Sequence, residues 1–408
     1  MLCTGKPPAV RMPLLPPKDA VVRRFEIAAV QADIEYNRYG DHDPEGLIFL
    51  PYSKAKKHKC KKSRHRPLIL RANAGDWLEV KLYNMFDPGK PINYNDYPSV
   101  PLDMPHVPSN RVSLNAQFMR CDPVYSSGIN VGFNDVEQTA APGECITYIW
   151  HADKEYEGCI LSSFGDLRNH RHHGLFGALI TEAAGAEFYS TEPGAEDGIG
   201  DQAVIVPPGE EAFREFVLLA HNGIRLLDKN GKLIKTTIGQ AANGHGAPDH
   251  EDTGEKGYNY RSERFFNRLE RNSDISRVFD SKTHGDPATP VFKAYAGDRI
   301  VFRLLMPADK PRNISFLLHG HVWRAQPKDP LSNITAAQGA VSIGGAYTIE
   351  PQGMRPGPGD YMYRSGSLKW DVESGMWGIL RILRHSIKEC CLTVCKKAVC
   401  WCKSRFNR

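Results

Sequence analysis

The chain has 408 residues, which is too long for one ordinary hydrophobic core, so two domains are expected. Hydrophobic residues make up 41% and charged residues 24%, as in globular proteins, and no apolar run approaches the ~18 residues that span a bilayer. A net charge of +5 is modest for this length and does not favour a nucleic-acid partner.

Strand patterns, rather than helix patterns, run along the chain. Apolar and polar residues alternate in Trp77–Leu82 and again in Arg299–Leu304, as in strands with one buried face. The 36 glycines and 29 prolines indicate many turns. Gly239–Tyr260, rich in Gly, Asp and His, predicts a long loop. The predicted fold class is all-β, with Greek-key β-sandwich domains.

Three sequence landmarks occur twice in the same order, which predicts a duplicated fold. Each combines a turn with an apolar strand pattern. The matched pairs are Leu70–Val80 with Phe292–Phe302, Ala141–Tyr148 with Gly357–Tyr363, and Gly174–Ile180 with Gly375–Arg381.

The duplication predicts a first sandwich over residues 20–190 and a second over 200–384, with the boundary where Gly, Glu and Pro cluster. Residues 385–408 form a basic tail that we expect to be disordered. Cys390, Cys391, Cys395, Cys400 and Cys402 crowd this tail in a spacing that matches no ordinary zinc pattern.

The other cysteines, Cys3, Cys60, Cys121, Cys145 and Cys159, are scattered. They could be buried thiols or form one or two disulfides, and the sequence does not pair them.

Two histidines stand two residues apart in the β-type run Ser315–Trp323. Side chains at this spacing on a strand share a face and lie about 6–7 Å apart, so the pattern aims His319 and His321 at one site or at two adjacent sites. Imidazole is a common ligand of copper, zinc and iron. The alternative is a pair of structural histidines held by hydrogen bonds.

A second cluster, His170–His173, precedes an apolar strand pattern. We expect a solvated loop there, with His173 at a turn. Because a site between the two clusters is conceivable, His173 is a third candidate metal ligand.

Along most of residues 20–383 the chain resembles bacterial multicopper oxidases of the manganese-oxidase-like type. The segments that carry the resemblance are Tyr36–Pro44, His173–Ile180, Phe213–Leu219, His284–Pro290 and Leu318–His321. The resemblance implies cupredoxin domains, copper as cofactor, one-electron oxidation with oxygen as acceptor, and a place outside the cell or in its envelope. The N-terminal residues Met1–Pro8 show no apolar signal segment, so the localisation stays open.

A working enzyme of this family needs a thiolate and imidazoles as copper ligands. Aligned on the family's motifs, most of these positions carry other side chains. They are Asn115, Gln117, Phe164, Asp166, Ile314, Leu317, Ser365, Gly366, Ser367 and Asp371. The resemblance therefore implies that the blue copper site is missing.

Two functions remain open from the sequence. The first is a copper-binding oxidoreductase that oxidises Mn(II), Fe(II) or a phenolic reductant with oxygen, with copper near His319, His321 and His173 and with help from a second copy in a homo-oligomer. The alternative is a non-catalytic cupredoxin-like protein with a structural or metal-sequestering role. The substrate is a small molecule or a metal ion, and no catalytic residue is identified.

Overall fold

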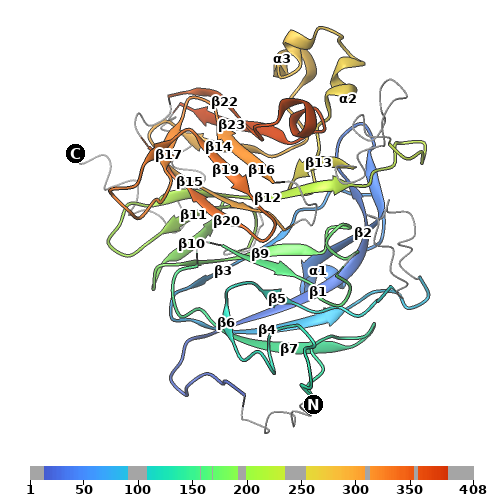
Figure 1. Cartoon of the computed structure of the whole chain (residues 1–408), viewed down its shortest axis with the longest axis vertical. Helices are drawn as coiled ribbons and strands as arrows, with labels where there is room; N and C mark the ends of the chain where they lie inside the picture. The colour runs from blue at the N-terminus through green and yellow to red at the C-terminus, as the bar shows by residue number, and fades with distance from the viewer. Residues whose placement is uncertain are drawn as a thin grey trace, which may run out of the picture.

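The computed structural model describes residues 13–90, 108–156, 158–167, 169–191, 199–234, 254–307, 313–352 and 357–384. The cysteine-rich tail 385–408, Cys3 and the N-terminal residues 1–12 lie outside the described residues. The described chain is built almost entirely of strands, in two halves that lie one above the other (Figure 1).

The first half has two sheets with strand orders β2-β1-β4-β7-β6 and β3-β9-β8-β5. A core of residues from both sheets fills the space between them, as in a β-sandwich. Its elements are β1 (Val22–Glu35), β2 (His42–Pro51), α1 (Tyr52–Ala55), β3 (Leu68–Asn73), β4 (Trp77–Asn84), β5 (Asn115–Ala116), β6 (Arg120–Cys121), β7 (Cys145–His151), β8 (Cys159–Ser162) and β9 (Phe176–Glu182).

The second half repeats this architecture. Its two main sheets have the strand orders β10-β11-β12-β15-β20 and β14-β23-β22-β16-β19, and β13 pairs with β12. A small third sheet has the order β18-β17-β21. Its strands are β10 (Glu187–Ser190), β11 (Gln202–Val206), β12 (Phe213–Ile224), β13 (Glu255–Tyr258), β14 (Val291–Tyr295), β15 (Arg299–Leu305), β16 (Ile314–Leu318), β17 (Val322–Arg324), β18 (Ile334–Thr335), β19 (Ala337–Val341), β20 (Ala346–Ile349), β21 (Pro351–Gln352), β22 (Gly359–Arg364) and β23 (Trp377–Leu383). Its helices are short: α2 (Phe265–Leu269), η2 (Ile275–Arg277), α3 (Ser281–His284) and η3 (Leu368–Val372).

The prediction of an all-β protein with two cupredoxin-like Greek-key sandwiches is confirmed. The strands predicted at Trp77–Leu82 and Arg299–Leu304 are β4 and β15. Residues 239–253 of the predicted loop lie outside the described residues, and the prediction was wrong at the end of the loop, because β13 lies there. We keep the division into residues 20–190 and 200–384 as a proposal; β10 already pairs with β11 of the second half.

The two halves share an unusual pattern of parallel pairing. In the first half β1 runs parallel to β4 and β3 runs parallel to β9; in the second half β12 runs parallel to β15 and β14 runs parallel to β23. The first and third sequence landmarks therefore fall on strands with matching partners.

The second landmark does not match in this way. Ala141–Tyr148 leads into β7, which pairs with β4, whereas Gly357–Tyr363 leads into β22, which pairs with β23 and β16. The strand that corresponds to β22 by pairing is β8, since β8 pairs with β9 and β5. A Pro-Gly-acid turn can open any strand, so its sequence did not identify which one.

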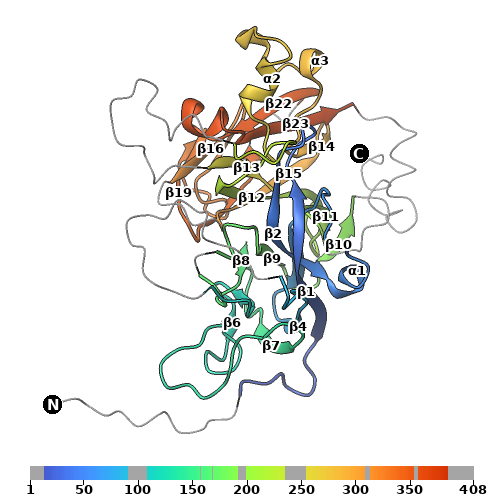
Figure 2. The ribbon, with the colours of Figure 1, turned by 90° about the vertical axis from the view of Figure 1, so that its right-hand side faces the viewer.

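The two halves are joined by a shared apolar layer. On β12, Phe216, Leu218 and Ala220 face the core of the second half, while Val217 and Leu219 face the first half. On β9, Phe176, Ala178 and Ile180 enter the same shared layer. Because both faces of these strands are buried, their sequences read as continuous apolar runs. Figure 2 shows β1 and β2 extending from the first half along the second.

A buried chain of four ionisable side chains also crosses the junction. Glu215 on β12 accepts hydrogen bonds from Arg71 Nε at 2.7 Å and from Arg303 Nε at 3.0 Å. Arg303 also donates to Glu182 on β9. Burial opposes the charge of Glu215, but the two guanidinium groups outweigh it and lower the pKa of this carboxyl. Acidic and basic groups thus alternate across the junction.

We expect Glu215→Gln to lower the free energy of unfolding by about 3–5 kcal/mol, because it leaves two buried guanidinium groups without their carboxylate. Glu79→Gln is a matched control, since Glu79 pairs with Arg24 at the surface, at 3.4 Å, and should change stability by less than about 1 kcal/mol. Chemical denaturation measures both. Equal effects of the two substitutions would contradict the role of the buried network.

A second junction network surrounds Asp41, which accepts hydrogen bonds from Arg264 Nη2 at 2.8 Å and from Asn267 Nδ2 at 2.8 Å. Glu255 on β13 lies next to this group. Burial raises the pKa of Glu255, and the nearby Asp41 raises it further. The positive charges of Arg264 and Lys256 lower it in part, so the pKa is about 7. Glu255 is therefore protonated in the folded protein at mildly acidic pH.

This pKa predicts how stability depends on pH. The unfolded chain gives Glu255 its ordinary pKa of 4.5, so between pH 4.5 and 7 the folded protein binds one more proton than the unfolded chain. The free energy of unfolding therefore falls as the pH rises through this window. Glu255→Gln should flatten the decline, measured by denaturation at several pH values. An unchanged slope in the variant would show that Glu255 does not titrate there.

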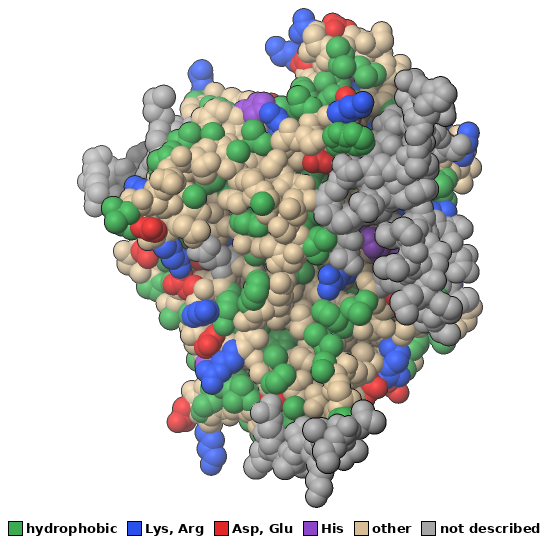
Figure 3. Space-filling view, in the orientation of Figure 1, with side chains coloured by type: hydrophobic (Ala, Val, Ile, Leu, Met, Phe, Trp, Pro, Cys, Tyr) green, Lys and Arg blue, Asp and Glu red, His purple; other side chains and the backbone are tan. Residues whose placement is uncertain are grey.

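Among the described residues, no helix is long and apolar enough to cross a membrane. On the face shown in Figure 3, acidic and basic side chains are scattered among apolar ones.

Candidate metal centre

His319 and His321 lie in a turn, not in the middle of a strand as the sequence pattern predicted. β16 ends at Leu318 and β17 begins at Val322. The main-chain N–H of His321 donates to the carbonyl of Leu318, and Gly320 has a φ of +74°, a conformation that favours glycine. The argument that period-2 alternation aims both imidazoles at one site therefore does not apply here.

His319 is exposed, and its Nε2 accepts a hydrogen bond from Arg364 Nε at 2.9 Å. Partial burial and the positive charge of Arg364 lower the pKa of His319, so its ring is neutral at pH 7. A neutral imidazole can bind a metal ion, but here the adjacent guanidinium repels a cation and occupies one ring nitrogen.

His321 is buried and faces a different environment. Its Nδ1 donates to the carbonyl oxygen of His319 at 2.8 Å, and its ring meets Tyr361 edge-on with 4.8 Å between centroids. Since a carbonyl only accepts, Nδ1 carries a proton, and in the neutral ring Nε2 holds the lone pair.

His173 lies at the junction of the two halves, where it forms a dyad with Asp43. Its Nδ1 is 3.0 Å from Asp43 Oδ2, and both side chains are at most 3% exposed. Burial lowers the pKa of His173, but the attraction of and hydrogen bond to Asp43 outweigh it, so the pKa is raised. A carboxylate in this position orients an imidazole, as it does for metal-binding histidines.

His221 is a further buried histidine that the sequence reasoning missed. It follows the apolar run of β12, and its Nε2 donates to the carbonyl of His172 at 3.1 Å. Burial lowers its pKa to about 4, and the neighbouring His173 contributes to this shift. Within the described residues its Nδ1 has no hydrogen-bond partner. A histidine at the end of a buried apolar strand was the signal in the sequence.

His173 lies at a turn, as predicted, but the expectation that the loop is solvated was wrong, because His170 and His173 are buried. His170 is fully buried; its Nδ1 is 2.9 Å from Ser163 Oγ, and its Nε2 is 3.1 Å from the carbonyl of Ser109. The groups that bury these histidines come from other strands and loops, so the local sequence did not indicate them.

The histidines do not converge on one centre. In the described part of the chain, no group of three or more His, Cys, Asp and Glu side chains is arranged to hold a metal ion. Cys60, Cys121, Cys145 and Cys159 are free thiols there, and burial raises the pKa of Cys159 to about 12. A protonated buried thiol is a poor copper ligand.

Second-half positions that the resemblance assigns to copper ligands are filled by an ion pair. Asp371 Oδ1 lies 3.0 Å from Lys256 Nζ, and Ser365 Oγ donates to Asp371 Oδ2. Gly366 stands at the thiolate position, and its main-chain N–H donates a hydrogen bond to Ser315 Oγ at 2.9 Å. These donors are oxygen atoms beside an ammonium group, which does not suit a blue copper site.

The corresponding first-half positions are also locally satisfied. Asn115 Nδ2 donates to the carbonyl of Ser127 at 2.7 Å. Asp166 accepts from the main chain of Ser109 and from Asn169, each at 3.0 Å. The guanidinium of Arg171 lies over the ring of Phe164, 5.3 Å from its centroid. These side chains contact neighbouring residues of the chain.

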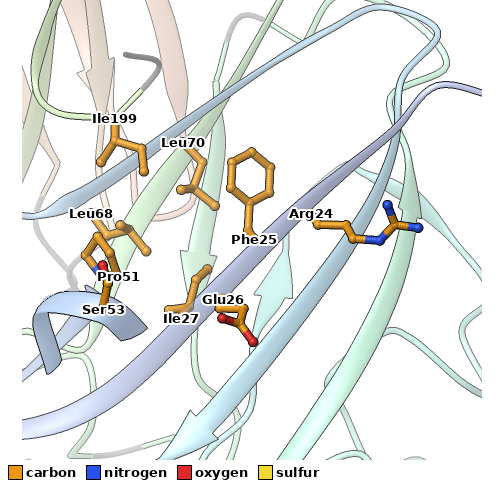
Figure 4. Close-up of a pocket in the computed structure, with 9 residues that line it drawn as sticks. All are labelled: Arg24, Phe25, Glu26, Ile27, Pro51, Ser53, Leu68, Leu70 and Ile199. Atoms are coloured by element: carbon orange, nitrogen blue, oxygen red, sulfur yellow. The ribbon is translucent and has the colours of Figure 1, made fainter. Parts of the chain in front are cut away.

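A pocket of about 220 Å³ opens beside β1 and β3 (Figure 4). It is smaller than usual ligand pockets of about 300–1,000 Å³. Its lining has no histidine or cysteine, and it meets the edge of the first core. The lining residues are Arg24, Phe25, Glu26, Ile27, Pro51, Ser53, Leu68, Leu70 and Ile199. It does not provide a metal centre.

Comparisons with known proteins support the fold. A multicopper oxidase superposes with a TM-score of 0.53 and 16% identity, over 91% of this chain and 93% of its own. A copper nitrite reductase from Nitrosomonas europaea gives 0.50 and 16%, over 89% and 94%. A multi-copper oxidase from Pseudomonas thermotolerans gives 0.50 and 14%, over 90% of this chain and 64% of its own.

No family model and no curated protein matches the sequence. At these identities the likeness shows a cupredoxin-like fold. The residues present do not fit the copper centres that this fold and the sequence resemblance imply, because serine, glycine and aspartate stand in place of thiolate and imidazole, and a lysine pairs with the aspartate.

Proposed function

We propose that this chain is a non-catalytic relative of the copper oxidoreductases, a cupredoxin-like protein with a structural or metal-sequestering role. The observation that carries the proposal is the buried Lys256–Asp371 pair, which stands where the resemblance puts a ligand of the electron-accepting copper. The neighbouring positions carry Ser365 and Gly366. Without a thiolate and imidazoles there is no route for electrons through a blue copper.

A second candidate is a working copper oxidoreductase that oxidises Mn(II), Fe(II) or a phenolic reductant with oxygen. The breadth of the fold likeness favours it, since the match covers 91% of this chain and 93% of a multicopper oxidase. It would need metal ligands from a second copy, and hence a homo-oligomer.

Oxygen uptake separates the two functions. The purified full chain, incubated with Cu(I) or Cu(II), should consume no oxygen above the rate of free copper when Mn(II), Fe(II) or a phenol is added. It should also lack the intense visible absorption of a copper–thiolate bond. Copper-dependent oxygen uptake by a defined oligomer would replace the first proposal with the second.

We also propose that His319, His321 and His173 are the residues through which the chain can still bind copper, as separate ligands rather than one centre. His319 is exposed, and Arg364 contacts only its Nε2; the Nδ1 of His321 donates to the carbonyl oxygen of His319, which leaves its Nε2 as the ring nitrogen that could bind a metal ion. His173 is held by Asp43 at the junction.

His319→Ala combined with His321→Ala should lower copper binding without unfolding the protein, because both residues lie in a turn between β16 and β17. Metal analysis after equilibrium dialysis measures the occupancy, and circular dichroism checks the fold. His58→Ala is a matched control, since His58 is a partly buried histidine in a separate loop. Equal copper occupancy in the double variant and the parent would rule out the pair.

A further inference from the structure

A buried polar cluster lies on the inner face of β12 and β13. In the antiparallel pairing Asn222 is opposite Lys256, and Ala220 is opposite Tyr258, so these side chains share a face. Ala220 and Tyr258 belong to the core of the second half. Asn222 and Tyr258 are fully buried, and Lys256 is 2% exposed. An ammonium group is rarely found in such a place unless it is paired.

Asp371 supplies the negative charge. Its Oδ1 lies 3.0 Å from Lys256 Nζ, and its Oδ2 accepts from Ser365 Oγ. The main chain holds this carboxylate in place, since the carbonyl of Asp371 accepts from Met376 N at 2.9 Å and Ser365 N donates to the carbonyl of Met376. The loop that presents Asp371 is thus tied to β22 and to the start of β23.

Two neighbouring side chains, those of Asn222 and Tyr258, could form further hydrogen bonds. Among the described residues, Asn222 Oδ1, Asn222 Nδ2 and Tyr258 Oη are buried without a hydrogen-bond partner. Burial raises the pKa of Tyr258, and the Asp371 carboxylate adds to the effect, which places the phenol within the field of the ion pair. Buried polar atoms of this kind are normally satisfied by ordered water.

We propose that the Lys256 ammonium is a built-in cation that takes the place of a metal ion in the second half, with water bound between it, Asn222 and Tyr258. The cluster offers one carboxylate, one hydroxyl, one amide and one phenol, which are hard oxygen and nitrogen donors unsuited to copper(I). The fixed ammonium neutralises Asp371, and a copper ion added beside it would face repulsion at short range.

This inference deepens the proposed function, because it explains how the fold persists without the metal that the resemblance implies. It also defines a ligand class for the site. Lys256→Ala removes the side chain beyond Cβ, so the vacated space has the shape and charge preference of a propylammonium ion beside Asp371.

The test measures thermal unfolding of the full chain. Lys256→Ala should lower Tm by about 5–10 °C, because Asp371 is left buried without its cation. Propylammonium chloride at millimolar concentration should restore much of this loss, while sodium chloride at equal ionic strength should not. Lys282→Ala, an exposed lysine of α3, is the matched control and should respond to neither.

The proposal is overturned if Lys256→Ala keeps the parental Tm, or if propylammonium rescues no better than sodium chloride. If Lys256→Ala yields no folded protein, the double variant with Lys256→Met and Asp371→Asn tests the proposal instead. A folded double variant supports the proposal, because removing both charges leaves none unpaired, and an unfolded one overturns it. Oxygen uptake by the parent protein would contradict the proposed non-catalytic function, but it would not change the outcome of this unfolding test.

Discussion

The structure depends on the burial of β9 and β12 from both sides. Each strand faces its own core with one set of side chains and the shared layer with the other. Two-sided burial leaves no room for an unpaired charge, and Glu215 is tolerated only because Arg71 and Arg303 approach it from two other strands. The junction therefore fixes the relative position of the halves through both apolar contact and charge complementarity.

The same demand for local satisfaction explains the state of the copper-ligand positions. Asp166, Asn115 and Asp371 each have hydrogen-bond partners at ordinary distances. The side chains at these positions bind their own neighbours and form polar networks within the sandwich.

Sequence patterns predicted several strands from local signals. β4 alternates between buried and partly exposed residues as predicted, whereas β15 is buried beyond its first residue although its sequence alternates. The matching pairs of β3 with β9 and β14 with β23 follow the repeated landmarks. The site was less predictable because it is built by tertiary contacts. Gly320 has a positive φ and places His319 and His321 in a turn, where the sequence pattern predicted a strand. The buried His173 is hydrogen-bonded to Asp43, which is distant in sequence. The buried His170 is hydrogen-bonded to Ser163, which lies outside the turn that holds His170. β13 exists because it pairs with β12, and that pairing brings Lys256 inside.

Charge balance connects these features. Each of the buried carboxylates Asp41, Glu215, Glu263 and Asp371 lies against a guanidinium or ammonium group supplied by the chain. A metalloprotein can neutralise buried acids with bound cations, whose affinity depends on supply and pH. A lysine or arginine side chain is always present, and an arginine stays charged over the physiological range. Where fixed cations already neutralise the acids, a divalent ion would add uncompensated positive charge, so these buried carboxylates are balanced by the chain's own cations.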